Sequence, residues 1–374
     1  MSAADLSGPE HPRRTLELIG HEAAEQSLRQ AGTSGRLHHG WLLTGPRGVG
    51  KATLAYRFAR FLLARPVQTG PSLFAEPEPW PDSLAMAPEH PVAQRVAAAS
   101  HGNLAGVERA WDDKGKRRYS EIRVDDIRRM ARHFATTAAE GGWRVAVIDS
   151  ADEMNRSAAN ALLKLLEEPP ASTVLLLVSH APGRLLPTIR SRCRRLMLSP
   201  LSREQVAQVL RTRLPDLTPS DAQALAALSD GAPGRALALA EAGGLGLYRS
   251  LIGSLAGLPD LDGVAVHKLA GDLAVKANEE RCRLFLDLLF DWTASLVRAG
   301  AAGHDVATVT GDEPALAQKL LALAPPAAWL ELWEQARRAA ATAQSLHLDR
   351  KQLVLSLMGA YQAVASGQPS PLRP

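Results

Sequence analysis

The clearest chemistry in this sequence belongs to a glycine-rich loop that ends in a lysine, GPRGVGK at 45–51. The loop follows a short apolar run at 40–44 and precedes a stretch whose apolar residues recur at helical spacing. Glycines let backbone N–H groups converge on phosphate oxygens, the helix N-terminus adds a positive dipole, and the lysine supplies a charge for the outer phosphates. The predicted phosphate-binding residues are Gly45, Pro46, Gly48, Gly50, Lys51 and Thr53. The alternative is an ordinary strand-to-helix turn.

One position of this loop departs from the usual pattern. A phosphate loop that holds magnesium has Ser or Thr directly after the lysine. This chain has Ala52 there, with Thr53 one place later. The loop keeps its shape but lacks the usual metal ligand, so we expect ATP or ADP to bind weakly and leave magnesium binding open.

A second candidate element is the segment 143–149, WRVAVID, which is predicted to be a buried strand ending in Asp149. In phosphate-loop ATPases such a strand places an aspartate beside the magnesium ion, and a neighbouring glutamate can polarise the attacking water. Asp149 therefore joins the predicted nucleotide-binding residues. The next residue is Ser150, which cannot act as a base, and we interpret Asp152 and Glu153 as helix caps. Ala52 and Ser150 together argue against hydrolysis.

These elements need a scaffold of strands and helices that alternate along the chain. The sequence predicts helices at 124–139 and 155–166, and a further apolar strand at 173–179. This alternation is typical of a mostly parallel sheet covered on both faces.

Beyond Pro200 the strands stop and helices follow. Ser202 and Gln205 form a predicted capping box for a helix over 201–214. After about residue 250 the chain is almost wholly helical in pattern. The predicted fold class is therefore α/β followed by all-α.

Length and composition limit the class of protein. A chain of 374 residues and 40.0 kDa predicts two or three domains. The composition, 46% hydrophobic and 22% charged, excludes a disordered or fibrous chain. The two cysteines, Cys193 and Cys282, exclude a disulfide scaffold and a cysteine-based zinc site, and no metal site is predicted. Without a membrane-spanning run or a signal peptide, we expect a cytoplasmic protein.

The net charge of +4 is mildly basic, and the basic residues cluster at 114–118 and 189–195. Such clusters are more often solvated surfaces than binding patches. A plain DNA-binding protein is therefore the weakest of the functions considered, and a steep salt dependence of DNA affinity would support it.

Two longer motifs carry a resemblance to a known family. ANALLKLLEEPP at 159–170, followed by LLPTIRSRCRR at 185–195, resembles the clamp-loader ATPases, an AAA+ family of the bacterial replicative DNA polymerase. The resemblance covers about residues 21–243. It implies an AAA+ phosphate-loop module with a parallel sheet over 1–200, a small helical lid over 201–248, and a helical collar over 249–374 that serves oligomerisation.

The resemblance also implies partners and a catalytic residue. Clamp loaders are hetero-pentameric rings of motor ATPase subunits (gamma/tau-like), a delta-like subunit and others, which load a sliding clamp on primed DNA. In this family the motif Ser191-Arg192-Cys193 places an arginine at the ATP of the neighbouring subunit, so Arg192 is the predicted arginine finger in trans. A planar guanidinium can hold a γ-phosphate with two hydrogen bonds. The alternative is that Arg190, Arg192, Arg194 and Arg195 form a basic surface run.

The sequence departs from this family in two further places. Many relatives carry a four-cysteine zinc module where this chain has residues 66–110, and that region contains no cysteine. Gly234 stands where active relatives place a lid arginine, and we interpret the neighbouring Arg235 as a surface residue.

The favoured function is a non-hydrolysing structural subunit of the clamp loader, and so a component of the DNA polymerase complex. The alternative is an active motor ATPase. The glycine-rich loop favours that alternative, and Ala52 and Ser150 oppose it.

Overall fold

The computed structural model describes residues 11–65, 80–111, 118–136, 142–303, 305–346 and 348–372. The chain divides into two compact units, Met1–Gln205 and Val206–Pro374, and each is described by itself. The end of the helix predicted at 124–139, most of the basic cluster at 114–118 and part of the region 66–110 lie outside the described residues.

The first unit is built on one parallel sheet. Among the described residues five strands form it, in the order β2-β3-β4-β1-β5. Their bounds are β1 Gly40–Thr44, β2 Leu104–Val107, β3 Arg144–Ile148, β4 Thr173–Ser179 and β5 Arg194–Met197. The inner strands β1 and β4 are buried along their whole length, because a parallel sheet covered on both faces is made from apolar runs. The α/β part of the predicted fold class is confirmed.

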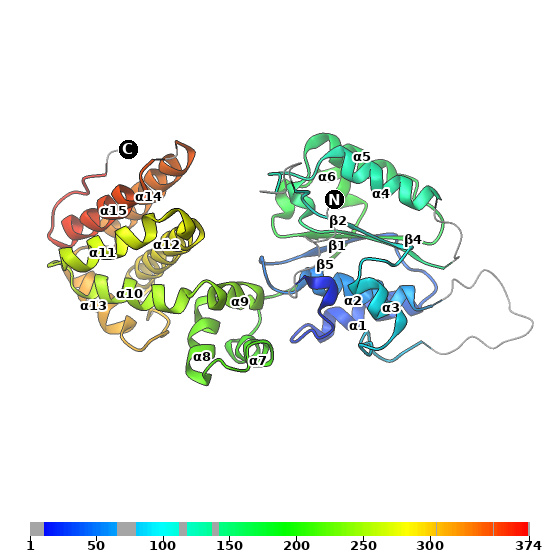
Figure 1. Cartoon of the computed structure of the whole chain (residues 1–374), viewed down its shortest axis with the longest axis horizontal. Helices are drawn as coiled ribbons and strands as arrows, with labels where there is room; N and C mark the ends of the chain where they lie inside the picture. Colours follow the sequence, from blue (N-terminus) through cyan, green and yellow to red (C-terminus); the bar gives the residue numbers. More distant parts are fainter. Residues whose placement is uncertain are drawn as a thin grey trace, which may run out of the picture. The chain divides into compact units, whose positions relative to one another are not determined.

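Helices cover both faces of this sheet (Figure 1). Their bounds are α1 Glu22–Thr33, α2 Lys51–Leu63, α3 Pro91–Ala97, α4 Val124–Thr136, α5 Arg156–Glu167 and α6 Pro187–Ser191. Helices α4 and α5 pack on one face, where Ile127 and Leu162 share a core with Leu42 and Leu177 of the sheet. Helices α1 and α2 cover the other face. This layering leaves the two ends of each strand as the edges at which side chains can meet a ligand or partner.

The second unit is helical throughout its described residues, apart from turns and loops. After α7 Arg203–Arg213, which starts in the first unit, the bounds are α8 Pro219–Leu228, α9 Pro233–Glu241, α10 Gly244–Ala256, α11 Gly263–Ala274, α12 Glu279–Ala302, α13 Glu313–Leu323, α14 Pro326–Ser345 and α15 Arg350–Ala365. The all-α second part of the fold class is thereby confirmed, and the chain has an α/β module followed by helices. The bounds expected for the lid and collar, 201–248 and 249–374, stay predictions; α10 continues through residue 248.

The predicted capping box is present at the start of α7. The N–H of Gln205 donates to Ser202 Oγ at 3.2 Å, and the N–H of Ser202 donates to Gln205 Oε1 at 2.9 Å. This reciprocal pair satisfies two N–H groups that would otherwise lack a partner.

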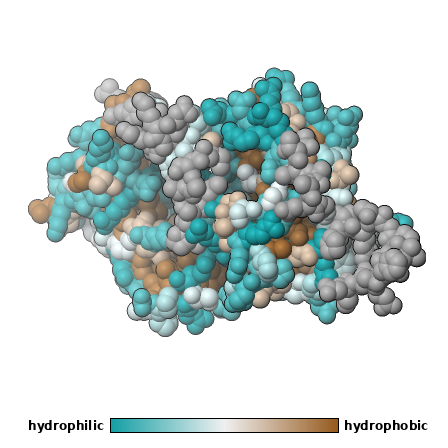
Figure 2. Space-filling view, turned by 45° about the vertical axis from the view of Figure 1, so that its right-hand side comes forward, coloured by the Kyte–Doolittle hydropathy of each residue, from teal (hydrophilic) through white to brown (hydrophobic). Residues whose placement is uncertain are grey.

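Hydrophilic residues cover most of the face shown in Figure 2, and apolar residues appear in separate patches. None of the helices in the described ranges is both long enough and apolar enough to cross a membrane. The large apolar side chains that are exposed among the described residues are Met197, Val264, Val275, Leu330, Leu346 and Leu348. All but the first belong to the second unit.

Candidate functional site

The glycine-rich loop connects the carboxyl end of β1 to α2, as the sequence predicts. Gly45, Gly48 and Gly50 have φ angles of +145°, +80° and +109°, which glycine adopts without the strain that a side chain would add. A β-carbon at Gly45 would lie 2.3 Å from the carbonyl oxygen of Leu198. Within the described ranges no side chain caps the N-terminus of α2, so the N–H groups of its first turn can meet phosphate oxygens. The loop therefore has the shape of a phosphate cradle.

Lys51 is turned into its own loop. Its ammonium donates to the carbonyl oxygens of Gly45 at 2.8 Å and of Pro46 at 2.6 Å, and only 5% of the residue is exposed. Burial lowers the pKa of Lys51 to about 8, although the carboxylates of Asp149 and Asp152 oppose the shift. A phosphate in the loop would have to compete with these two carbonyl oxygens for the ammonium protons.

The loop lacks the hydroxyl that usually holds magnesium directly after the lysine. Ala52 follows Lys51 and has no side-chain oxygen. Thr53 comes one residue later on α2, which turns it by about 100° around the helix axis. Burial raises the pKa of Asp149, Glu108 adds to the rise and Lys51 opposes it. The loop residues fit a phosphate group, and in the described part of the chain no group of three or more His, Cys, Asp or Glu side chains gathers as metal ligands would.

The acidic residues after Asp149 are held by partners from distant segments. Ser150 has a left-handed backbone, φ +58°, and a 3-10 turn follows over Ala151–Glu153. Asp152 Oδ1 accepts the backbone N–H of His180 at 3.1 Å, and Oδ2 lies 3.2 Å from His180 Nε2. Glu153 Oε2 lies 2.8 Å from Arg109 Nε. These acids therefore tie segments together; they lie in the first turn of the 3-10 helix, as the interpretation of them as caps requires, whereas the side chain that caps α5 is Asn155.

The sequence did not predict that basic residues are buried next to the loop. Arg60 is 1% exposed and donates to the carbonyl oxygens of Arg13 at 3.0 Å and Thr15 at 2.8 Å. His21 Nε2 lies 2.8 Å from the carbonyl oxygen of Val49 in the loop. These contacts fix the segment before α1 against α2 and the loop. Arginines on a helix usually indicate an exposed face, so no local signal marked Arg60 as buried.

Arg192 lies on the opposite side of the sheet's strands from the loop, near their amino ends. It follows α6 and precedes β5, and a β-carbon at Gly40 would lie 3.0 Å from the carbonyl oxygen of Arg192. Arg192 is thus beside the amino end of β1, whereas the loop begins after Thr44 at its carboxyl end. At about 3.3 Å per residue, the strand separates the two by about 16 Å, which is farther than an arginine side chain extends. The structure does not bring Arg192 and the other predicted site residues together within one chain.

The guanidinium of Arg192 is held in place but accessible. One terminal nitrogen lies 2.8 Å from Glu167 Oε1, the other donates to the carbonyl oxygen of Thr188 at 3.2 Å, and 39% of the side chain is exposed. Burial raises the pKa of the neighbouring Cys193 to about 12, so that group stays a thiol.

The other arginines of this run have different surroundings. Arg194 lies over the ring of Trp41 at 5.1 Å, Arg195 donates to Thr44 Oγ1 at 3.3 Å, and Arg190 is exposed. Their partners differ, but Arg190, Arg194 and Arg195 are all exposed, as in the basic surface run that is the alternative.

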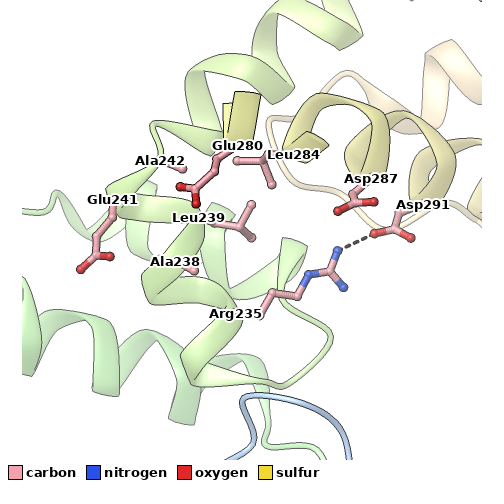
Figure 3. Close-up of a pocket in the computed structure, with 9 residues that line it drawn as sticks. All are labelled: Arg235, Ala238, Leu239, Glu241, Ala242, Glu280, Leu284, Asp287 and Asp291. Atoms are coloured by element: carbon pink, nitrogen blue, oxygen red, sulfur yellow. Dashed lines mark hydrogen bonds and ion pairs between the residues drawn. The ribbon is translucent and has the colours of Figure 1, made fainter. Parts of the chain in front are cut away.

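Arg235 lies in the second unit, on α9. It pairs with Asp230 at 2.8 Å and with Asp291 of α12 at 2.5 Å, and it lines a hollow of about 690 Å³ together with Leu239, Leu284 and several acids (Figure 3). Its guanidinium serves as an ion-pair partner between two helices, which agrees with the surface role expected for it.

The chain is similar to subunits of DNA polymerase III. A family model described as "DNA polymerase III, delta subunit" matches residues 20–202. The delta′ subunit of Pseudomonas aeruginosa is 34% identical over 270 residues, which cover 72% of this chain and 74% of that protein. The delta′ subunit of Escherichia coli is 35% identical over 215 residues, 55% of each chain.

More distant similarities extend further along the chain. The tau subunit of Salmonella typhimurium is 28% identical over 334 residues, 86% of this chain but only 48% of that protein. The chain therefore spans about half the length of this relative. A solved structure of a DNA polymerase III gamma subunit-related protein from Thermotoga maritima aligns with a TM-score of 0.40 and 16% identity, over 90% of this chain and 99% of that one.

Proposed function

Because the chain belongs to the DNA polymerase III delta′ family, we propose that it is a structural clamp-loader subunit that supplies Arg192 to the ATP of a neighbouring subunit. The proposed partners are gamma/tau-like motor subunits and a delta-like subunit in a hetero-pentameric ring. This ring would load the sliding clamp on primed DNA. The similarity to tau and gamma/tau subunits supports this set of partners.

The position of Arg192 is the observation that carries this proposal. The residue is half-exposed at the amino edge of the sheet, too far from its own loop to serve a phosphate there. A guanidinium in this place acts on a phosphate only if another chain brings one to it. Arginine fingers accelerate phosphoryl transfer by about 10³–10⁵.

The same chain is proposed not to turn over ATP itself. Ala52 offers no magnesium ligand, and Ser150 replaces the expected base. Asp152 and Glu153, the nearest further carboxylates in sequence, are engaged by His180 and Arg109. The glycine-rich loop is still shaped for phosphate, so we propose weak binding of ATP or ADP without hydrolysis.

Assembly is assigned to the helical second unit. Among its described residues five large apolar side chains are exposed, two of them in α11 or at its end and the others in α14 or within three residues of its end. An apolar patch is typical of a surface that contacts a partner when such side chains lie together. We propose that the collar, 249–374, makes the ring contacts.

The test measures phosphate release by the purified chain alone and then in the complex reconstituted with its motor and delta-like subunits. The chain alone should release none. In the complex, Arg192→Ala should remove the turnover of the site that faces this chain, and Arg192→Lys should restore little of it, because an ammonium lacks the two-pronged geometry. Arg190→Ala is the matched control and should behave as the wild type.

Two outcomes would contradict the proposal. Hydrolysis at a motor-like rate by the isolated chain would favour the active ATPase alternative. If Arg192→Ala and Arg190→Ala lowered DNA affinity equally and left turnover per bound complex unchanged, Arg192 would be a DNA-backbone contact.

A further inference from the structure

The guanidinium of Arg192 is fixed by two elements of its own chain. Glu167, the last residue of α5, lies with Oε1 2.8 Å from one terminal nitrogen. The carbonyl oxygen of Thr188 in α6 accepts from the other terminal nitrogen at 3.2 Å. Two anchors on two different nitrogens set both the position and the plane of the guanidinium before any partner binds.

This ion pair contributes little to folding. The side chains of Glu167 and Arg192 are 50% and 39% exposed, and exposed pairs of this kind are weak because water and salt screen them. What the pair does change is the freedom of the arginine, because a long side chain has many rotamers and loses entropy when it is held in one. The effect of the pair is therefore on geometry more than on stability.

The anchored arginine keeps the donors that a phosphate needs. A guanidinium has five N–H groups, and the two contacts use one on each terminal nitrogen. The remaining N–H groups can still donate to phosphate oxygens. Glu167 can thus hold Arg192 in the conformation in which Arg192 binds a phosphate.

We infer that Glu167 is a positioning residue, which holds Arg192 ready for the triphosphate bound by the neighbouring subunit. This inference rests on the proposed role of Arg192. The carboxylate touches neither ATP nor the reacting atoms; it acts by holding the guanidinium where the γ-phosphate arrives, which lowers the cost of ordering it during turnover.

The adjacent glutamate offers a matched control. Glu168 carries the same charge as Glu167 and directly follows it, but the ion pair with Arg192 is made by Glu167. Replacement of either residue by alanine changes the net charge equally. A difference between the two variants therefore reports on the contact with Arg192 and not on charge in general.

The experiment uses the full chain in a reconstituted complex in which only the motor subunit facing it keeps a functional phosphate loop. Glu167→Ala should lower kcat for ATP by about tenfold, since small errors in placing a catalytic group are costly, while KM changes less than about twofold. Glu167→Gln should recover most of the rate, because its amide oxygen can accept the same hydrogen bond. Glu168→Ala should match the wild type. In the background of Arg192→Ala, Glu167→Ala should cause no further loss.

The outcomes separate this inference from the proposed function. If Arg192→Ala lowers turnover but Glu167→Ala does not, Glu167 has no positioning role and the inference fails alone. If Arg192→Ala itself has no effect, the proposed function fails and the inference with it. An equal loss in Glu168→Ala, a further loss in the Arg192→Ala background, or a lowered Tm that Glu167→Gln shares would make the contact structural and overturn the inference.

Discussion

A different cationic side chain lies near each end of strand β1, and the protein holds the two in different ways. At the carboxyl end, Lys51 is buried and donates to two carbonyl oxygens of its own loop. At the amino end, Arg192 is half-exposed and held by Glu167 and Thr188 with donors to spare. The ammonium of Lys51 has its hydrogen-bond acceptors within its own loop, whereas the guanidinium of Arg192 is accessible to solvent.

The two residue types also differ in how their charge depends on pH. Burial lowers the pKa of Lys51 to about 8, so its charge depends on conditions near neutral pH. An arginine stays charged throughout this range and offers a planar fork that suits a phosphate. This contrast fits the proposed function, in which Arg192 acts on a phosphate that a neighbouring subunit brings.

The loop at the carboxyl edge should tolerate almost no added volume. We expect Gly45→Ala to lower the free energy of unfolding by about 2–4 kcal/mol, because the new methyl group meets the carbonyl of Leu198 at 2.3 Å and the backbone has φ +145°. Gly183→Ala is the control, since a β-carbon at that position would meet no atom within 4 Å in the described part of the chain. Chemical denaturation of both variants measures the difference, and equal stability would show that the loop is not held tightly.

Nucleotide binding at the loop should weaken as the pH rises through about 8. Below that pH the ammonium of Lys51 is charged and attracts phosphate; above it the free chain loses the proton, because burial has lowered the pKa. The affinity for ADP should fall by up to about tenfold per pH unit above 8. Titration calorimetry between pH 6.5 and 9.5 (about the range over which Lys51 changes charge) measures this. Lys51→Met should bind more weakly with a flat profile, and a wild-type profile equally flat would exclude Lys51 from phosphate binding.

Much of the first unit could be predicted from the sequence. Strands β1 and β4 coincide with the apolar runs at 40–44 and 173–179, and the loop lies between β1 and α2 as expected. Such runs are strong signals because a strand buried on both faces must be apolar throughout. Strand β5 escaped prediction because Arg194 and Arg195 occupy half of it, which an edge strand permits and a central strand does not.

The contacts that decide how the site works could not be predicted. Asp152 meets His180, and Arg192 meets Glu167, across long separations in sequence. Lys51 is close to its partners in sequence, but the motif alone does not say whether its ammonium faces the loop carbonyls or the solvent. Such choices depend on burial and on three-dimensional neighbours, and neither has a fixed spacing along the chain.

The central claim, that this chain acts through its amino edge and not through its own loop, is tested most directly by one comparison of ATP turnover. Complexes in which only the motor subunit facing this chain keeps a functional phosphate loop are reconstituted with Lys51→Met or with Arg192→Ala, and DNA-stimulated phosphate release is measured at equal complex concentration. We predict that Lys51→Met stays within about twofold of the wild type, while Arg192→Ala lowers the turnover of the facing site by at least about a hundredfold. The reverse result, with turnover lost in Lys51→Met and kept in Arg192→Ala, would contradict the account and identify the chain as a motor subunit.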